Sequence, residues 1–234
     1  MPAPSREESS LDFDISATYI LLMPAGSASV LSRPGKIVCI GRNYVEHARE
    51  LGNEMPKEPL FFLKPPSSVI GDGEPIIIPA MSRQVDYEGE IGVVIEKPLR
   101  RCSETDARGA IGGIAAANDV TARDLQKLDS QWTRAKGFDT FCPIGSLGKA
   151  PADLTTLSVV TRVNGIERQR ASASQMAFTI PLLLAYISQV MTLEPGDLVL
   201  TGTPGGIGTL TPGDEVEVEV PGVSRVRNPV KADR

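Results

Sequence analysis

The chain has 234 residues, enough for one domain with a full hydrophobic core, and its formal net charge is −5. This acidic balance argues against a nucleic-acid-binding surface. The 3 cysteines lie far apart without CxxC spacing, so the sequence indicates neither a disulfide framework nor a zinc site. We therefore expect a reduced, cytoplasmic protein without nucleic-acid or membrane partners.

The predicted elements are mostly short strands. Residues 1–16 are polar, and we expect a flexible tail there; residues 17–234 are expected to form a single catalytic domain that begins with a short β segment at 18–23. Apolar runs bounded by Pro or Gly predict further strands at 36–40, 60–63, 75–79, 91–96, 158–163, 197–201 and 215–220. Helical patterns cover 44–51, 104–111, 119–129 and 181–191. The fold class expected is α+β, mainly β, with a few packed helices.

The segment 85–95 is rich in Val and Ile and reads as a strand that carries two acidic residues. Successive side chains of a strand point to opposite faces, so Glu88 and Glu90 should share a face about 6.8 Å apart, with Gly89 facing the other way. A divalent cation would relieve the repulsion between two such carboxylates, which is roughly 4 kcal/mol at 4 Å. Asp119 follows an apolar run and can bring a third oxygen. The three residues together predict a magnesium or manganese site.

A Glu-X-Glu pair on a strand is more often part of a solvated face. Here the face continues into Gly92 and Val94, while the opposite face carries Ile91, Val93 and Ile95. Carboxylates within such an apolar stretch need a partner, which favours the metal site.

Two further groups could take part in chemistry. His47, the only histidine of the chain, lies three residues before Glu50, and on a helix this spacing places both on one face, where the carboxylate can polarise the imidazole of a general base. A surface position for His47 is the alternative. Lys136 precedes a Gly-Phe-Asp turn and could supply positive charge to an oxyanion, although an isolated lysine is usually solvated.

The glycine-rich stretch 201–208 follows a predicted strand and offers backbone amides that could hold a carboxylate. It lacks the Lys-Ser/Thr ending of a phosphate-binding loop, so a tight turn is an equally good interpretation.

Six motifs, taken in order, resemble those of the fumarylacetoacetate hydrolase superfamily. They are Gly41–Tyr44 with His47 and Glu50, Leu60–Pro65, Asp86–Glu90, Asn118–Asp124, Lys136–Pro143 and Leu200–Pro204. The resemblance implies the mixed β-roll fold of that family, a homodimer, and a Mg²⁺ or Mn²⁺ ion held by Glu88, Glu90 and Asp119. It also implies a His47–Glu50 dyad, a catalytic Lys136, and substrate contacts from Arg42, Gln126 and Thr203.

The similarity is to the short members of the superfamily, which comprise acylpyruvases, oxaloacetate decarboxylases and homoprotocatechuate-pathway isomerase-decarboxylases. It implies an enzyme acting on a small 2-oxo acid through a metal-stabilised enolate, with hydrolysis of an acylpyruvate-type diketo acid as the first expectation. Decarboxylation of oxaloacetate and isomerisation of a hydroxymuconate-type dienoate in aromatic catabolism are the alternatives. A non-catalytic domain that binds a metal and a keto acid is a more remote one. Many short members have a His-His pair where this chain has Asp86-Tyr87, which leaves the subgroup open.

Overall fold

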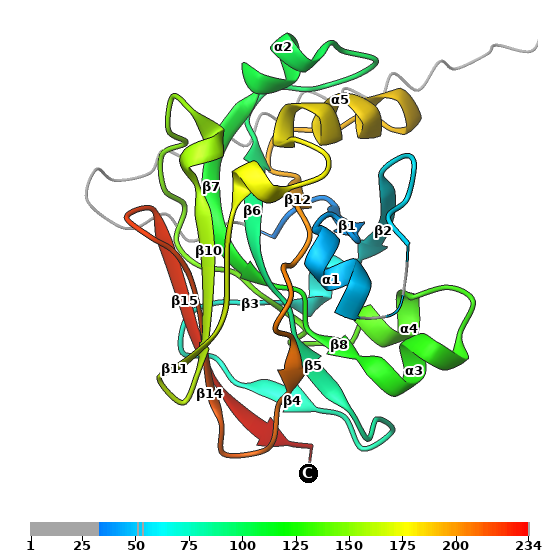
Figure 1. Cartoon of the computed structure of the whole chain (residues 1–234), viewed down its shortest axis with the longest axis vertical. Coiled ribbons are helices and arrows are strands. Elements are labelled where there is room, and N and C mark those ends of the chain that lie inside the picture. Colours follow the sequence, from blue (N-terminus) through cyan, green and yellow to red (C-terminus); the bar gives the residue numbers. More distant parts are fainter. Residues whose placement is uncertain (1–32, 51, 53, 234) are drawn as a thin grey trace, which may run out of the picture.

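The protein is described here by a computed structural model, which covers residues 33–50, 52 and 54–233. The tail expected at 1–16 and the strand expected at 18–23 lie outside these residues. The described chain is built around two five-stranded sheets, with helices at their ends and along one side (Figure 1). An α+β fold that is mainly β is confirmed.

The first sheet has the strand order β2-β1-β12-β6-β7. Its strands, in chain order, are β1 (Ile37–Gly41), β2 (Leu60–Lys64), β6 (Gly89–Ile95), β7 (Ile111–Asn118) and β12 (Leu198–Leu200). β1 and β12 run parallel, whereas the other neighbours are antiparallel. The parallel pairing brings the end of β12, and the glycine-rich stretch after it, next to the segment that follows β1.

The second sheet has the order β11-β10-β14-β15-β4. Its strands are β4 (Ile76–Ile78), β10 (Ser158–Val163), β11 (Ile166–Ser172), β14 (Glu215–Val220) and β15 (Ser224–Ala232). It packs against β6 and β7, and the largest core cluster includes side chains from both sheets, such as Ile91, Val93, Val159 and Val218. The two faces expected for β6 are confirmed, because Ile91, Val93 and Ile95 belong to this cluster and Val94 to another.

Two further sheets are smaller. One contains β13 (Gly208–Thr209), β5 (Val85–Tyr87) and β8 (Thr121–Ala122), in that order; the other pairs β3 (Val69–Ile70) with β9 (Cys142–Pro143). β5 and β6 are separated only by Glu88. The chain therefore passes from one sheet to another at this residue.

The α-helices are α1 (Val45–Glu50), α2 (Glu104–Arg108), α3 (Arg123–Leu128), α4 (Thr133–Lys136) and α5 (Ile180–Val190). Single 3-10 turns occur at Pro66–Ser68, Leu154–Thr156 and Ala173–Gln175. α5 starts where the Thr179 side chain accepts a hydrogen bond from Leu182 N, and its buried side includes Leu183, Leu184 and Ile187. No helix in the described part of the chain is long and apolar enough to cross a membrane.

Most sequence-based boundaries agree with the structure within two residues, but three predictions were wrong. The strand expected across 85–95 is interrupted at Glu88, because its two halves pair with different sheets. The helix expected from residue 119 starts only at Arg123, since Thr121 and Ala122 pair with β5. The helix expected to reach residue 111 ends at Arg108, and β7 follows.

Candidate active site

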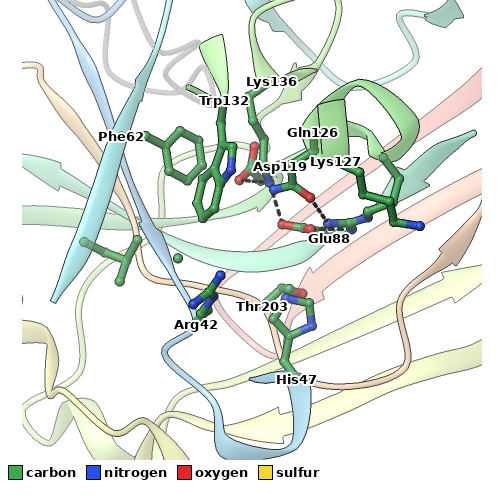
Figure 2. Close-up of a pocket in the computed structure, with 13 residues that line it drawn as sticks. Arg42, His47, Phe62, Glu88, Asp119, Gln126, Lys127, Trp132, Lys136 and Thr203 are labelled. Atoms are coloured by element: carbon green, nitrogen blue, oxygen red, sulfur yellow. Dashed lines mark hydrogen bonds and ion pairs between the residues drawn. The ribbon is translucent and has the colours of Figure 1, made fainter. Parts of the chain in front are cut away.

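A cavity of about 300 Å³ brings together most of the residues singled out in the sequence. It is lined by Ile40, Gly41, Arg42, His47, Phe62, Glu88, Asp119, Arg123, Gln126, Lys127, Trp132, Lys136 and Thr203. Figure 2 shows Arg42 and His47 on one side of the cavity and Glu88, Asp119 and Lys136 on the other, with Phe62 and Trp132 forming an aromatic wall. Two predicted residues, Glu50 and Glu90, do not line it.

Three buried carboxylates converge at the site. One ligand atom from each of Glu88, Glu90 and Asp119 lies within 4.8 Å of those of the other two. Asp119 N donates to Glu88 O at 2.8 Å, and Glu88 N donates to the Asn118 side-chain oxygen at 3.0 Å. These bonds join the end of β7 to the break between β5 and β6. The break therefore does not separate the carboxylates but holds Glu88 beside Asp119.

Two lysines are buried among these carboxylates. Lys136 Nζ donates to Glu88 Oε2 at 2.8 Å and to Asp119 Oδ2 at 2.7 Å. Lys64 Nζ donates to Asp119 Oδ1 at 2.6 Å and to Val120 O at 3.1 Å. Burial lowers the pKa of Lys136, but Asp119 and Glu88 raise it more, so its net shift is upward and its ammonium stays charged. The alternative of a solvated Lys136 is wrong, since it is 2% exposed.

Arg123 binds the carboxylate oxygen of Glu88 that Lys136 does not contact. Its guanidinium donates to Glu88 Oε1 at 2.6 Å, to Asp86 Oδ2 at 3.0 Å and to Gln126 Oε1 at 2.7 Å. Burial alone would raise the pKa of Glu88, but Lys136 and Arg123 hold it well below its usual range. Glu88 is therefore ionised and fixed in orientation.

Glu90 differs from the other two carboxylates. It accepts a hydrogen bond from Gly202 N at 2.6 Å, but it forms no ion pair with a basic side chain of the described residues. Burial raises its pKa well above the usual value, and the neighbouring Asp119 and Glu88 raise it further. A buried carboxylate in this position lacks a cationic partner, and three carboxylate oxygens are ligands of hard divalent cations such as Mg²⁺ or Mn²⁺. The residues present therefore fit such an ion.

His47 lies on α1 and is buried, so the alternative of a surface histidine is wrong. Its Nδ1 lies 3.7 Å from Glu50 Oε2, the same-face arrangement expected from the spacing, and it has no hydrogen-bond partner within the described structure. Burial lowers the pKa of His47, with Arg123 and Lys136 adding to this effect. The imidazole is therefore neutral near pH 7, the state in which it can accept a proton.

The remaining expected contact residues also lie at the cavity. Arg42 follows β1 in a left-handed conformation with φ 59°, which is costly for a residue with a side chain and is typical of functional sites. Thr203 Oγ1 donates to Gly89 O at 2.9 Å and accepts from Gln169 Nε2 at 2.8 Å. The hydroxyl proton of Thr203 is therefore already donated to a backbone oxygen of the protein.

The glycine-rich stretch 201–208 does hold carboxylates through its amides, but they are the protein's own. Gly202 N donates to Glu90, and Gly206 N donates to Glu50 Oε2 at 3.1 Å and Oε1 at 3.3 Å. Glycine is required at both positions by φ values of +95° and +92°.

Sequence reasoning missed several residues of the site. Phe62, Lys64 and Arg123 lay in the quoted motifs without an assigned role, and Trp132 had no assigned role either. Phe62 packs edge-on against Trp132 with ring centroids 5.2 Å apart, and Lys136 Nζ lies 5.1 Å from the Phe62 ring centroid. The one local signal was Lys64 at the end of an apolar strand, where an unpaired charge would be costly.

The family of the chain follows from comparison with known proteins. The family described as fumarylacetoacetate (FAA) hydrolase C-terminal matches residues 36–231. The chain belongs to the fumarylacetoacetate hydrolase family. The similarity recognised from the sequence motifs is thereby confirmed, and the chain is a member of an enzyme family.

Relatives within the family carry several activities in their names. The mitochondrial oxaloacetate decarboxylase of Dictyostelium discoideum is 45% identical over 195 residues, which cover 80% of this chain and 89% of that protein. The mitochondrial oxaloacetate tautomerase FAHD2A of Bos taurus is 39% identical over 229 residues, 92% of this chain and 73% of that protein. The structure of 5-carboxymethyl-2-hydroxymuconate delta-isomerase from Mycobacterium smegmatis aligns with a TM-score of 0.80 and 42% identity, covering 88% and 82% of the two chains.

Proposed function

We propose that this protein performs enolate chemistry on a small 2-oxo acid, assisted by a divalent cation bound to Glu88, Glu90 and Asp119. The observation that carries the proposal is the shared cavity. Glu88 and Asp119 of the carboxylate cluster, the charged Lys136 and the neutral His47 meet in one space of about 300 Å³, a size suited to a small metabolite.

A divalent cation at this site would supply Lewis-acid stabilisation of the negative charge that develops on the 2-oxo oxygen. The chain's own residues contribute in other ways. Lys136 adds a fixed positive charge beside Glu88 and Asp119, where it needs no reorganisation during the reaction. Phe62 and Trp132 exclude water from one side of the cavity, which strengthens these interactions.

Two basic residues of the lining favour a substrate with a second carboxylate. Arg42 and Lys127 form no ion pair with the described acidic residues, in contrast to Arg123 and Lys136, so they are available to a bound anion. We infer that the 2-oxo acid end lies at the carboxylate cluster and that a distal carboxylate reaches Arg42 or Lys127. Oxaloacetate has this form, and the names of two relatives favour it as the first candidate.

Hydrolysis of an acylpyruvate, which was the first expectation from the sequence, is the second candidate. It is supported by the lowered pKa of His47, because a neutral imidazole facing the cavity can take a proton from water. Isomerisation of a hydroxymuconate-type dienoate also proceeds through an enolate, formed without breaking a C–C bond, and is suggested by the name of a structural relative.

Purified protein should be assayed with Mg²⁺, with Mn²⁺ and with excess chelator on oxaloacetate, an acylpyruvate and a hydroxymuconate-type dienoate. The proposal expects turnover of at least one substrate that is lost on chelation and restored by the cation. Binding of the cation without turnover of any substrate would instead support a non-catalytic keto-acid-binding protein. The homodimer implied by the family remains a prediction, which light scattering would test.

A further inference from the structure

Tyr87 lies directly before Glu88, and the structure gives it a specific partner. The side chain is buried at the end of β5, and its hydroxyl donates to Gly206 O at 3.0 Å. Tyr87 pairs with Gly208 of β13, which places the tyrosine ring under the glycine-rich stretch. A Cβ at Gly208 would come within 2.9 Å of the Tyr87 hydroxyl oxygen, so the absence of a side chain there allows this contact.

Gly206, which accepts the Tyr87 hydrogen bond, also contacts the His47–Glu50 dyad. Gly206 N donates to Glu50, at 3.1 Å from Oε2, while its carbonyl accepts from Tyr87. Gly206 packs closely against the backbone of Arg168, because a Cβ there would meet Arg168 O at 2.2 Å. α1 approaches closely at the preceding residue, where a Cβ on Gly205 would lie 3.7 Å from Glu50 Oε2.

Glu50 needs this support. Its side chain is 36% exposed, and among the described residues its polar contacts are Gly206 N and the longer approach of 3.7 Å to His47 Nδ1. An exposed glutamate has several rotamers available, and a hydrogen bond from a fixed amide selects one of them. The position of Glu50 beside His47 therefore depends on where Gly206 is held.

We propose that Tyr87 is a positioning residue for His47. Its hydroxyl fixes Gly206, the amide of Gly206 holds the Glu50 carboxylate beside His47 Nδ1, and the carboxylate favours the ring tautomer with the proton on Nδ1. The other ring nitrogen, Nε2, is then the one able to accept a proton. Only the kinetic consequence of this arrangement rests on the proposed function; the orientation of the ring does not.

The test uses the fact that the chain has 1 histidine, so its imidazole nitrogens give an unambiguous NMR signal. Tyr87→Phe removes only the hydroxyl that contacts Gly206. Tyr186→Phe is the matched control, because the Tyr186 hydroxyl donates to Glu58 Oε2 at 3.3 Å, outside the active-site cavity. Glu50→Gln provides the signal of a ring without its carboxylate.

We expect Tyr87→Phe to move the His47 ¹⁵N signals in the same direction as Glu50→Gln, with Tyr186→Phe leaving them as in the wild type. The Gly206 amide should exchange with solvent faster in both Tyr87→Phe and Glu50→Ala, because Ala has no side-chain acceptor for this amide. With an active substrate, kcat of a His47-dependent reaction should fall about tenfold in Tyr87→Phe with little change in KM.

The proposal is overturned if Glu50→Gln moves the His47 signals and folded Tyr87→Phe does not. It is also overturned if exchange at Gly206 is unchanged in Glu50→Ala, which removes the acceptor, because the amide would then not bind the carboxylate. This second arm needs no Tyr87 variant to fold. If the wild-type protein turned over none of the tested substrates, the proposed function would be refuted, but the NMR result would remain valid.

Discussion

The ammonium of Lys136 lies 2.7 Å from the carboxylate of Asp119 in the interior of the protein. The same ammonium also binds Glu88, so one fixed positive charge is shared by two of the three carboxylates that we propose as metal ligands. Lys136 therefore has two opposing effects: it stabilises the folded cluster and it repels a second cation.

Replacing Lys136 by Met should separate these effects. Removal of one partner from a buried ion pair typically costs about 3–5 kcal/mol, so the metal-free variant should unfold at lower temperature. Its affinity for Mn²⁺ or Mg²⁺ should rise, since the repulsion is gone, while turnover falls. Calorimetric titration measures the cation affinity and thermal unfolding measures the stability.

Lys127→Met is the control. It changes an exposed lysine of the same cavity and should alter neither stability nor cation affinity by much. Weaker cation binding by Lys136→Met would show that Lys136 instead organises the ligands.

Glu90→Gln should uncouple cation binding from folding. Glu90 has no basic partner among the described residues, so the amide should stabilise the metal-free fold or leave it unchanged. Cation affinity should fall by at least about a hundredfold, because a charged ligand is lost. Glu96→Gln, at an exposed residue directly after β6, is the control and should bind the cation as the wild type does. A metal-free Glu90→Gln that is strongly destabilised would contradict this account of Glu90.

The same variant gives a pH test. The folded-state pKa of Glu90 lies well above the ordinary 4.5, so the folded protein binds this proton more tightly than the unfolded chain does. The resulting stability is fully present below pH 4.5 and is lost as pH rises towards the folded-state pKa. Without added cation, the advantage of Glu90→Gln over the wild type should therefore grow with increasing pH above 4.5. Unfolding curves at several pH values, in chelator, would measure it.

The local pattern around Glu88 and Glu90 was sufficient to predict a carboxylate cluster, because apolar alternation and acidic residues are visible over a few positions. The break of the strand at Glu88 was not predictable from that pattern, since it depends on β5 pairing with β8 and β13 while β6 pairs with β7 and β12. The break changed the local geometry without dispersing the cluster.

The cationic partners were harder to predict. Lys64 and Asp119 are 55 residues apart, and Lys136 and Glu88 are 48 apart, so only the folded sheets reveal that they meet. Similarly, the role of Tyr87 depends on β5 lying beside β13, a pairing of residues 121 positions apart. Periodicity indicates which face a residue occupies, but not what it faces.

Gly89 should tolerate no side chain. A Cβ there would lie 1.8 Å from Thr161 Oγ1, so Gly89→Ala must displace the buried Thr161 side chain, which lies on β10 of the second sheet. We expect a loss of stability of several kcal/mol, at the upper end of the 1–3 kcal/mol usual for overpacking or beyond it. Thr161→Ala alone should be nearly neutral, because the buried hydroxyl of Thr161 has no hydrogen-bond partner among the described residues. The double variant should recover part of the loss, as measured by denaturant unfolding. Equal stability of Gly89→Ala and the double variant would show that Thr161 is not the obstacle.

His47→Ala should distinguish the candidate reactions. Hydrolysis of an acylpyruvate needs a base to take a proton from water, so the variant should lose about a hundredfold to ten-thousandfold in activity. Decarboxylation of oxaloacetate requires stabilisation of the enolate but no attacking water, so much of that activity should remain. Glu50→Gln should change each reaction in the same direction as His47→Ala, because the carboxylate lies 3.7 Å from His47 Nδ1.

The pH dependence provides an independent check on His47. Burial lowers its pKa below the ordinary 6.5, so the imidazole loses its proton at lower pH than a solvated histidine does. A reaction that uses His47 as base should therefore gain activity with rising pH along a limb centred below 6.5, and this limb should disappear in His47→Ala. Initial rates at saturating cation, from pH 5 to 8, would measure it. Equal losses of hydrolysis and decarboxylation in His47→Ala, with the limb retained, would mean that His47 orders the cavity and that another group activates water.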